Sequence, residues 1–199
     1  MTMKNINHPK KGSNITVQPI RDIKDIESIK KMLVINTRDL LLFTSGINNG
    51  LRCGDILKLH VGDVRNLKVN DTLSIREQKT GKVNVLMVNK TTHKILRDYL
   101  SETKPSDDEY LFKSRKGNNM PLTVVYVNAL VKEWCRSINL KGNHGTHTLR
   151  KTFGYIQRKK YGVAWEVLSK RFNHSSPAVT MRYLGIEDKE VNGILMNEI

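Results

Sequence analysis

Residues 147–150 read His147-Thr148-Leu149-Arg150 and stand near the start of a segment, residues 146–161, that predicts a helix. Positions three apart lie on one face of a helix, so the His147 imidazole and the Arg150 guanidinium can reach one anion while Leu149 turns toward a core. An exposed pair, or a histidine satisfied within the core, would have the same spacing. The rest of the chain has to decide between these alternatives.

The pattern on both sides of this tetrapeptide predicts a helix-dominated chain. Helices are expected at residues 23–33, from residue 36 or 37 to a break at Gly46, at residues 51–59, 91–101, 122–138, 146–161 and 163–172, and from residue 188 onward. Residues 73–76 and 83–85 alternate as strands do, and the tight-turn sequence 78–82 between them carries lysines. The fold class predicted is therefore mixed α+β, helix-dominated, with one small antiparallel sheet.

A loop leading into another helix is predicted after residue 172. In Asn173-His174-Ser175-Ser176-Pro177 a serine can cap a helix, and proline suits the first helical position. Tyr183 follows His174 by nine residues. A tyrosine among apolar neighbours is commonly a core anchor, so neither residue alone indicates chemistry.

Charge indicates nucleic acid as the leading partner. The 199 residues include 34 Lys and Arg against 19 Asp and Glu, a formal charge of +15, and residues 141–182 hold nine basic residues and one acidic residue. A basic surface facing a polyanion gains from counterion release; the alternative is that these side chains only solvate helix faces. No apolar stretch is long enough to span a bilayer and no secretory signal is recognisable, so a cytoplasmic protein without a membrane partner is expected. Two cysteines without CxxC spacing indicate neither a disulfide framework nor a metal site.

Taken together, these motifs resemble the catalytic domain of the tyrosine recombinase (phage integrase) family. The resemblance extends from about residue 21 to about residue 185, and its motifs stand in the family's order with similar separations: Arg52 with Asp55, Lys79, His147 with Arg150, His174, and Tyr183. It implies the tyrosine recombinase catalytic-domain fold. It also implies a site-specific recombinase that cuts and rejoins duplex DNA through a 3′-phosphotyrosine, with no metal or other cofactor.

The resemblance also implies which residues carry the cleavage chemistry. Tyr183 would attack the phosphorus. Arg52 and Arg150 would stabilise the charge on the non-bridging oxygens, because a planar guanidinium can bind phosphate through two hydrogen bonds. A lysine of the hairpin would protonate the leaving 5′-oxygen; Lys79 is favoured, with Lys82 as its rival.

Three further residues are expected to assist. His147 would accept the tyrosine proton or hydrogen-bond to the phosphate, and His144, which has no arginine three residues on, ranks below it. His174 would donate to a non-bridging oxygen. Asp55 would fix the orientation of Arg52, or would be an exposed helix carboxylate.

Partners and alternatives follow from the same resemblance. The residues expected to contact double-stranded DNA are Lys82, Lys141, Lys151, Lys170 and Arg171. The protein would act as a homo-oligomer, a tetramer on DNA, in the nucleoid. A DNA topoisomerase of type IB remains an alternative, as does a catalytically idle DNA-binding regulator, although the complete polar set argues against an idle protein.

The sequence departs from the family pattern at several places. Phe172-Asn173 replaces the usual Leu-Gly, and asparagine tolerates the positive φ that glycine supplies; Lys151 stands where a histidine is frequent. Residues 1–20 predict a flexible basic arm where family members commonly carry a DNA-binding domain, so the arm could assist, the chain could be a fragment, or it could belong to a single-domain branch. Residues 186–199 predict a tail helix with an apolar stripe, which would pack on its own domain or on a neighbouring protomer.

Overall fold

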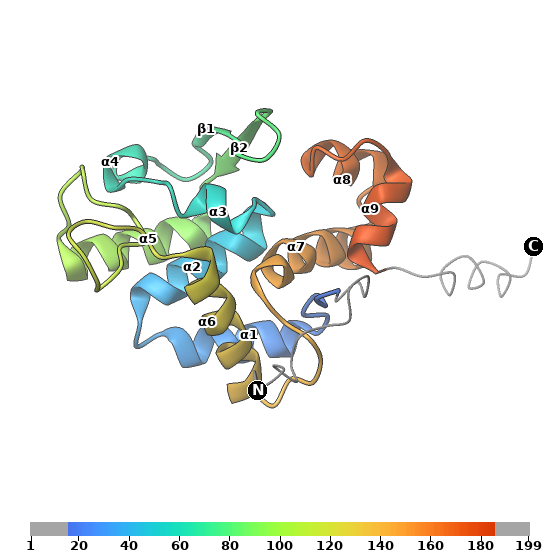
Figure 1. Cartoon of the computed structure of the whole chain (residues 1–199), viewed down its shortest axis with the longest axis horizontal. Helices are drawn as coiled ribbons and strands as arrows, with labels where there is room; N and C mark the ends of the chain where they lie inside the picture. The colour runs from blue at the N-terminus through green and yellow to red at the C-terminus, as the bar shows by residue number, and fades with distance from the viewer. Residues whose placement is uncertain (1–15, 186–199) are drawn as a thin grey trace, which may run out of the picture.

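A computed structural model of the chain describes residues 16–185. Within that range it contains α1 (Ile23–Leu33), α2 (Thr37–Asn49), α3 (Cys53–Ile56), α4 (Val61–Val64), β1 (Thr72–Arg76), β2 (Val83–Met87), α5 (Lys90–Thr103), α6 (Val124–Ser137), α7 (Thr146–Tyr161), α8 (Trp165–Arg171) and α9 (Pro177–Leu184) (Figure 1). The predicted fold class, helix-dominated with a two-stranded antiparallel sheet, is confirmed. No helix among these described residues is long and apolar enough to cross a membrane.

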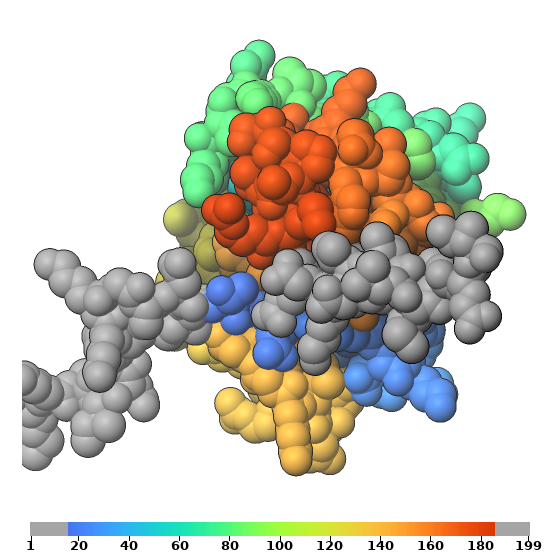
Figure 2. Space-filling model, turned by 90° about the vertical axis from the view of Figure 1, so that its right-hand side faces the viewer, coloured from blue at the N-terminus to red at the C-terminus, as the bar shows by residue number. Residues whose placement is uncertain are grey.

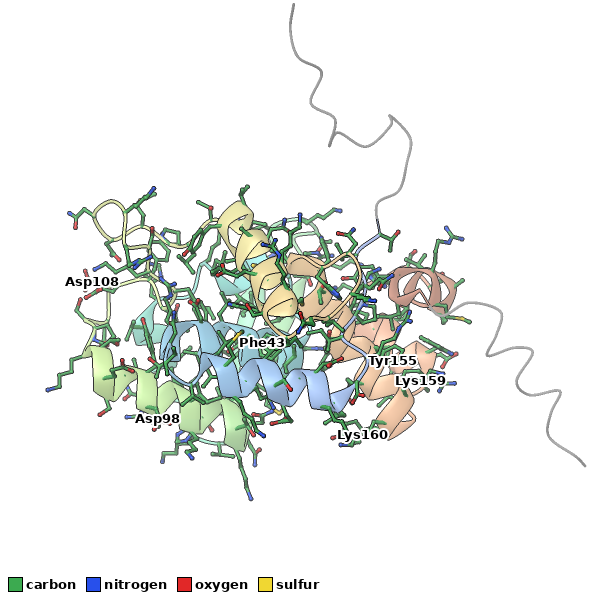
Figure 3. The ribbon with its side chains drawn as sticks, turned by 90° about the horizontal axis from the view of Figure 1, so that it is seen from below. Phe43, Asp98, Asp108, Tyr155, Lys159 and Lys160 are labelled. Atoms are coloured by element: carbon green, nitrogen blue, oxygen red, sulfur yellow. The ribbon has the colours of Figure 1, made fainter. Side chains whose placement is uncertain are left out.

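Helix α2 forms the centre of the main core and packs against α1, α5 and α7. Its Leu42 and Phe43 are fully buried, and the Phe43 ring meets the edge of Trp134 on α6. Figure 3 shows Phe43 in the interior, whereas Asp98 lies on the outer side of α5. The apolar stripes of four helices therefore converge on one buried helix, which holds α7 in a fixed position.

The prediction that α2 breaks at Gly46 is wrong. The helix continues to Asn49 and ends at Gly50, which has the left-handed φ of 58° that favours glycine at a helix end. At Gly46 a Cβ atom would lie 2.8 Å from Leu149 Cδ1, so this glycine allows α7 to approach α2 closely. The segment predicted as one helix over residues 51–59 contains the single-turn α3, and the short α4 was not predicted.

The β-hairpin is present as predicted. β1 and β2 pair antiparallel with Arg76 opposite Val83, and the turn between them leaves Lys79 and Lys82 exposed. Figure 1 shows the hairpin beyond α3, away from the layer formed by α1 and α6. The turn lysines are thus presented to solvent on the side of the molecule where α3 lies.

Helices α8 and α9 form a small unit that packs on α7. Its buried residues Leu168, Phe172 and Leu184 make a second apolar cluster, and they lie against Gly154 of α7, where a Cβ atom would come within 2.8 Å of both Phe172 and Leu184. Ser176 caps α9 and Pro177 occupies its first turn, as predicted. Figure 2 shows this unit, in red and orange, on the surface.

The structure corrects the predicted boundary of the N-terminal arm and does not describe the predicted tail helix. The arm predicted for residues 1–20 extends too far, because Ile20 is fully buried and donates its N–H to Thr152 on α7, while the Gln18 N–H bonds to the Asn143 carbonyl. These residues are tied to the domain by ordinary hydrogen bonds and burial. The predicted tail helix, residues 186–199, lies outside the described residues.

Candidate active site

Arg52 is the N-cap residue of α3, and its side chain lines the site. It forms an ion pair of 2.5 Å with Glu77, which directly follows the hairpin strand β1 and is 1% exposed. The Glu77 carboxylate also accepts hydrogen bonds from Thr80 (2.6 Å) and from Asn84 (3.0 Å). Arg52 is therefore held by a buried carboxylate whose remaining bonds are all made within the hairpin.

The ionisation of Glu77 is expected to stabilise the fold in a pH-dependent way. Burial opposes ionisation, but the hydrogen bonds from Thr80, Asn84 and Arg52 outweigh it and lower the pKa of Glu77 to about 2. The unfolded chain binds this proton more tightly, so the stabilisation is complete above about pH 4.5 and is lost as the pH falls toward about 2. Its size is on the order of 3 kcal/mol.

Urea unfolding of the wild type and of Glu77→Gln checks this expectation. The difference in the free energy of unfolding between the two proteins should be larger at pH 6 than at pH 3. A difference that does not change with pH would show that the carboxylate charge does not stabilise the fold.

Arg150 lies deeper in the site than Arg52. Its side chain is 2% exposed and donates to the carbonyl oxygens of Gly50 (2.5 Å) and Phe172 (2.8 Å). The guanidinium also stacks over the Phe172 ring at 4.6 Å. Both hydrogen-bond acceptors are neutral, so they orient the cation without cancelling its charge.

Tyr183 on α9 faces His147 on α7. Its hydroxyl lies 3.2 Å from His147 Nδ1. Burial raises the pKa of Tyr183 to about 12, although Arg150 and Arg52 act in the opposite direction. Desolvation, together with the charges of Arg150 and Lys151, lowers the pKa of His147. At neutral pH a protonated phenol thus faces an uncharged imidazole that can accept its proton.

His174 also lies close to the tyrosine ring. Its ring centre is 5.2 Å from that of Tyr183, and its Nδ1 is 2.9 Å from the Thr180 hydroxyl oxygen. Burial and the charges of Arg150 and Arg52 lower its pKa to about 4, so the imidazole is neutral near pH 7. The preceding Asn173 has φ 55°, so it does supply the positive φ expected of it.

A cleft of about 210 Å³ joins several of these residues. Its lining includes Arg52, Lys79, His147 and Arg150, together with Val124 at the start of α6. Tyr183 is not among the lining residues of this cleft, but its hydroxyl contacts His147, which lines it. The structure therefore brings together both arginines, the favoured hairpin lysine, His147 and the tyrosine, whereas Lys82 is exposed and does not line the cleft.

The residue that holds Arg52 differs from the one predicted. Asp55 is buried, and its carboxylate accepts the Gln78 N–H at 3.0 Å, so it fixes the start of the hairpin turn rather than pairing with Arg52. Glu77 takes the expected role. The sequence contains one signal for it: an acidic residue that directly follows an alternating strand and precedes Lys79.

Two residues predicted to contact DNA, Lys151 and Arg171, instead make contacts within the domain. Lys151 is 3% exposed, and its Nζ lies 5.0 Å from the centre of the Tyr183 ring, because its position on α7 turns it under α9. Arg171 donates to the carbonyls of Asn49 and Val85 and to the Asn84 side chain, and so ties α8 to α2 and the hairpin. By contrast, Lys82, Lys141 and Lys170 are exposed. In residues 16–185 no cluster of three His, Cys, Asp or Glu side chains could hold a metal ion.

Comparisons with known proteins show the family to which the chain belongs. The model of the phage integrase family matches residues 20–190. A probable integrase/recombinase, YoeC of Bacillus subtilis (strain 168), is 40% identical over 86% of this chain and 91% of its own length. The tyrosine recombinase XerC of Caldanaerobacter subterraneus is 26% identical over 83% of this chain but only 48% of its own length.

Solved structures show the same fold. The XerA recombinase superimposes with a TM-score of 0.73 at 17% identity, over 92% of this chain and 67% of XerA. The XerH site-specific recombinase, bound to palindromic difH substrate, also gives 0.73, at 21% identity, over 98% of this chain and 55% of XerH. The match covers most of the chain, and its fold is that of the recombinases, so the chain belongs to the phage integrase family of tyrosine recombinases.

Proposed function

We propose that the chain cuts and rejoins duplex DNA at specific sites through a covalent bond between Tyr183 and a 3′-phosphate. The observation that carries this proposal is the Tyr183 hydroxyl held 3.2 Å from His147, beside two arginines that face a shared cleft. A nucleophile, a proton acceptor and charge-stabilising donors in one place form the set that phosphoryl transfer needs.

The proposed reaction is a transesterification at phosphorus. The scissile phosphate lies between Arg52 and Arg150, which bind its non-bridging oxygens, and His174 donates to one of them. The Tyr183 oxygen forms a bond to phosphorus while its proton passes to His147. The bond from phosphorus to the 5′-oxygen breaks, and Lys79 gives that oxygen a proton. Attack by the 5′-hydroxyl of another strand reverses the sequence and releases the tyrosine.

A trapped covalent complex tests this function. Duplexes nicked close to a candidate site lose the short fragment after cleavage, so the 3′-phosphotyrosine accumulates. A protein–DNA band that survives denaturing electrophoresis is the expected result, and its absence with every candidate site would contradict the proposal. Relaxation of supercoiled DNA by the monomer, without strand exchange, would instead favour a topoisomerase.

We further propose that the active form is a homo-tetramer on DNA in the nucleoid. Relatives support a DNA-bound oligomer, since lambda integrase is described as a dimer bound to a core site. Strand exchange between two duplexes needs four tyrosines, one for each strand cut. Light scattering of the purified protein–DNA complex should give the mass of four chains and two duplexes, and a mass of one chain per duplex would argue against strand exchange.

DNA affinity is expected to fall steeply as salt is added. Of the residues predicted to contact DNA in the basic stretch 141–182, Lys141 and Lys170 are exposed, and the hairpin adds the exposed Lys79 and Lys82. Each phosphate neutralised contributes about −0.9 to the slope of log K against log salt, so these four contacts contribute about −3.6 to it. Fluorescence anisotropy between 50 and 300 mM salt measures the slope; a flat dependence would exclude this surface as the contact.

A further inference from the structure

A second basic cavity lies at the far end of α6. The C-terminal half of α6 and the following loop, residues 138–144, enclose about 530 Å³. Three cations line it, Lys132, Arg136 and Lys141, and its described lining contains no aspartate or glutamate. All three cationic side chains are exposed, so an anion from solvent can reach them.

His144 adds a polar group that lacks a partner. It lines the cavity and is 4% exposed, yet its Nδ1 has no hydrogen-bond partner among the described residues. Its Nε2 lies 3.3 Å from the Lys141 carbonyl oxygen, which assigns the hydrogen to Nε2. A buried polar atom without a partner is costly. Because His144 lines the cavity, a ligand that enters the cavity lies beside its ring, and the imidazole can report that binding.

The other surroundings of the cavity also favour an anion. Asn139 and Asn143 also line the cavity and carry no charge. Cys135 also lines the cavity; burial, and to a smaller extent the Asp25 carboxylate on α1, raise its pKa to about 12, but Asp25 does not line the cavity. A phosphate can accept hydrogen bonds from several donors at once, which suits the ammonium groups of Lys132 and Lys141 and the guanidinium of Arg136.

The cavity is separate from the catalytic cleft but connected to it by α6. Val124 lines the cleft, and Arg136 lines the cavity twelve residues later. At 1.5 Å per residue, these two positions are about 18 Å apart along the helix. Duplex DNA rises about 3.4 Å per base pair, so a duplex lying along α6 would cover this distance with about five base pairs.

We propose that this cavity is a second phosphate site: with the duplex lying along α6, it binds a backbone phosphate about five base pairs from the phosphate in the catalytic cleft. The assignment to DNA rests on the proposed function; free inorganic phosphate shares the chemistry and is the other source. A phosphate held here would fix the direction of the duplex relative to Tyr183, because contacts to the backbone position a protein without reading bases.

Two binding measurements on the full chain test the site. The test variant is Lys132→Gln with Arg136→Gln. The matched control, Lys90→Gln with Lys94→Gln, removes two exposed lysines of α5 that do not line the cavity. The first measurement titrates inorganic phosphate and follows the imidazole nitrogen signals of His144. The second measures the salt slope for a duplex with ten base pairs on each side of the cleavage site and for one with three.

The expected results separate the two sources of phosphate. The test variant should bind inorganic phosphate at least ten-fold more weakly than the control, and its salt slope on the long duplex should be smaller by about 1.8, with no difference on the short duplex. Weaker phosphate binding with equal slopes would support the site and assign it to free phosphate. Equal phosphate binding and equal slopes would overturn the proposal. Adduct formation by Tyr183 enters neither readout, so that result would leave the proposed function standing.

Discussion

Replacing Tyr183 by phenylalanine is expected to abolish the covalent DNA adduct and leave DNA binding unchanged. The change removes only the hydroxyl that lies 3.2 Å from His147. The ring keeps its contacts with Phe172, His174 and Lys151, so α9 should stay packed on α7. Because the attacking oxygen is lost, the adduct should fall below detection rather than decrease by a modest factor.

The measurement is denaturing electrophoresis on nicked duplexes, with DNA affinity determined in parallel. Tyr161→Phe is the matched control, since this tyrosine is exposed at the end of α7 and lies outside the cleft. The control should form the adduct at the wild-type rate. An adduct that persists in Tyr183→Phe would move the nucleophile elsewhere, and Tyr126, two residues after the cleft residue Val124, would be the next tyrosine to test.

Local signals were enough to predict most of the helices and the hairpin. The bounds of α7 agree with the prediction, because Gly162 follows its last residue in the left-handed conformation that ends helices. Asn173 supplies the positive φ that the family's glycine would have provided. At both positions a property of one residue fixes the backbone, and such a property can be read without knowing the neighbours in space.

Contacts between distant segments could not be predicted in this way. Gly46 is a helix breaker by local preference, yet α2 continues through it because Leu149, about a hundred positions later, packs there. The ion-pair partner of Arg52 is Glu77 rather than Asp55, which lies nearer in the sequence. Lys151 was predicted to contact DNA because it is basic, but Tyr183 of α9 packs against it. A single sequence shows spacing along the chain, whereas these outcomes depend on which segments meet.

Replacing Arg150 by lysine is expected to reduce the rate of DNA cleavage by about 10² to 10³, or roughly 3 to 4 kcal/mol in transition-state stabilisation. The charge is kept, so the loss would come from geometry. Two of the five N–H groups of Arg150 bond to the Gly50 and Phe172 carbonyls, which leaves three for the phosphate and Tyr183. A lysine has one nitrogen and cannot hold both carbonyls and still bind phosphate oxygens through two hydrogen bonds.

Single-turnover cleavage at saturating DNA measures this loss apart from binding. Arg158→Lys is the matched control, since it makes the same substitution on the same helix, where the arginine stacks on Trp165 away from the cleft. The control should cleave at the wild-type rate. Thermal unfolding of both variants separates a loss of folding from a loss of chemistry. Cleavage by folded Arg150→Lys within ten-fold of the wild-type rate would mean that a positive charge alone is sufficient at this position. The paired hydrogen bonds of the Arg150 guanidinium would then not be what stabilises the transition state.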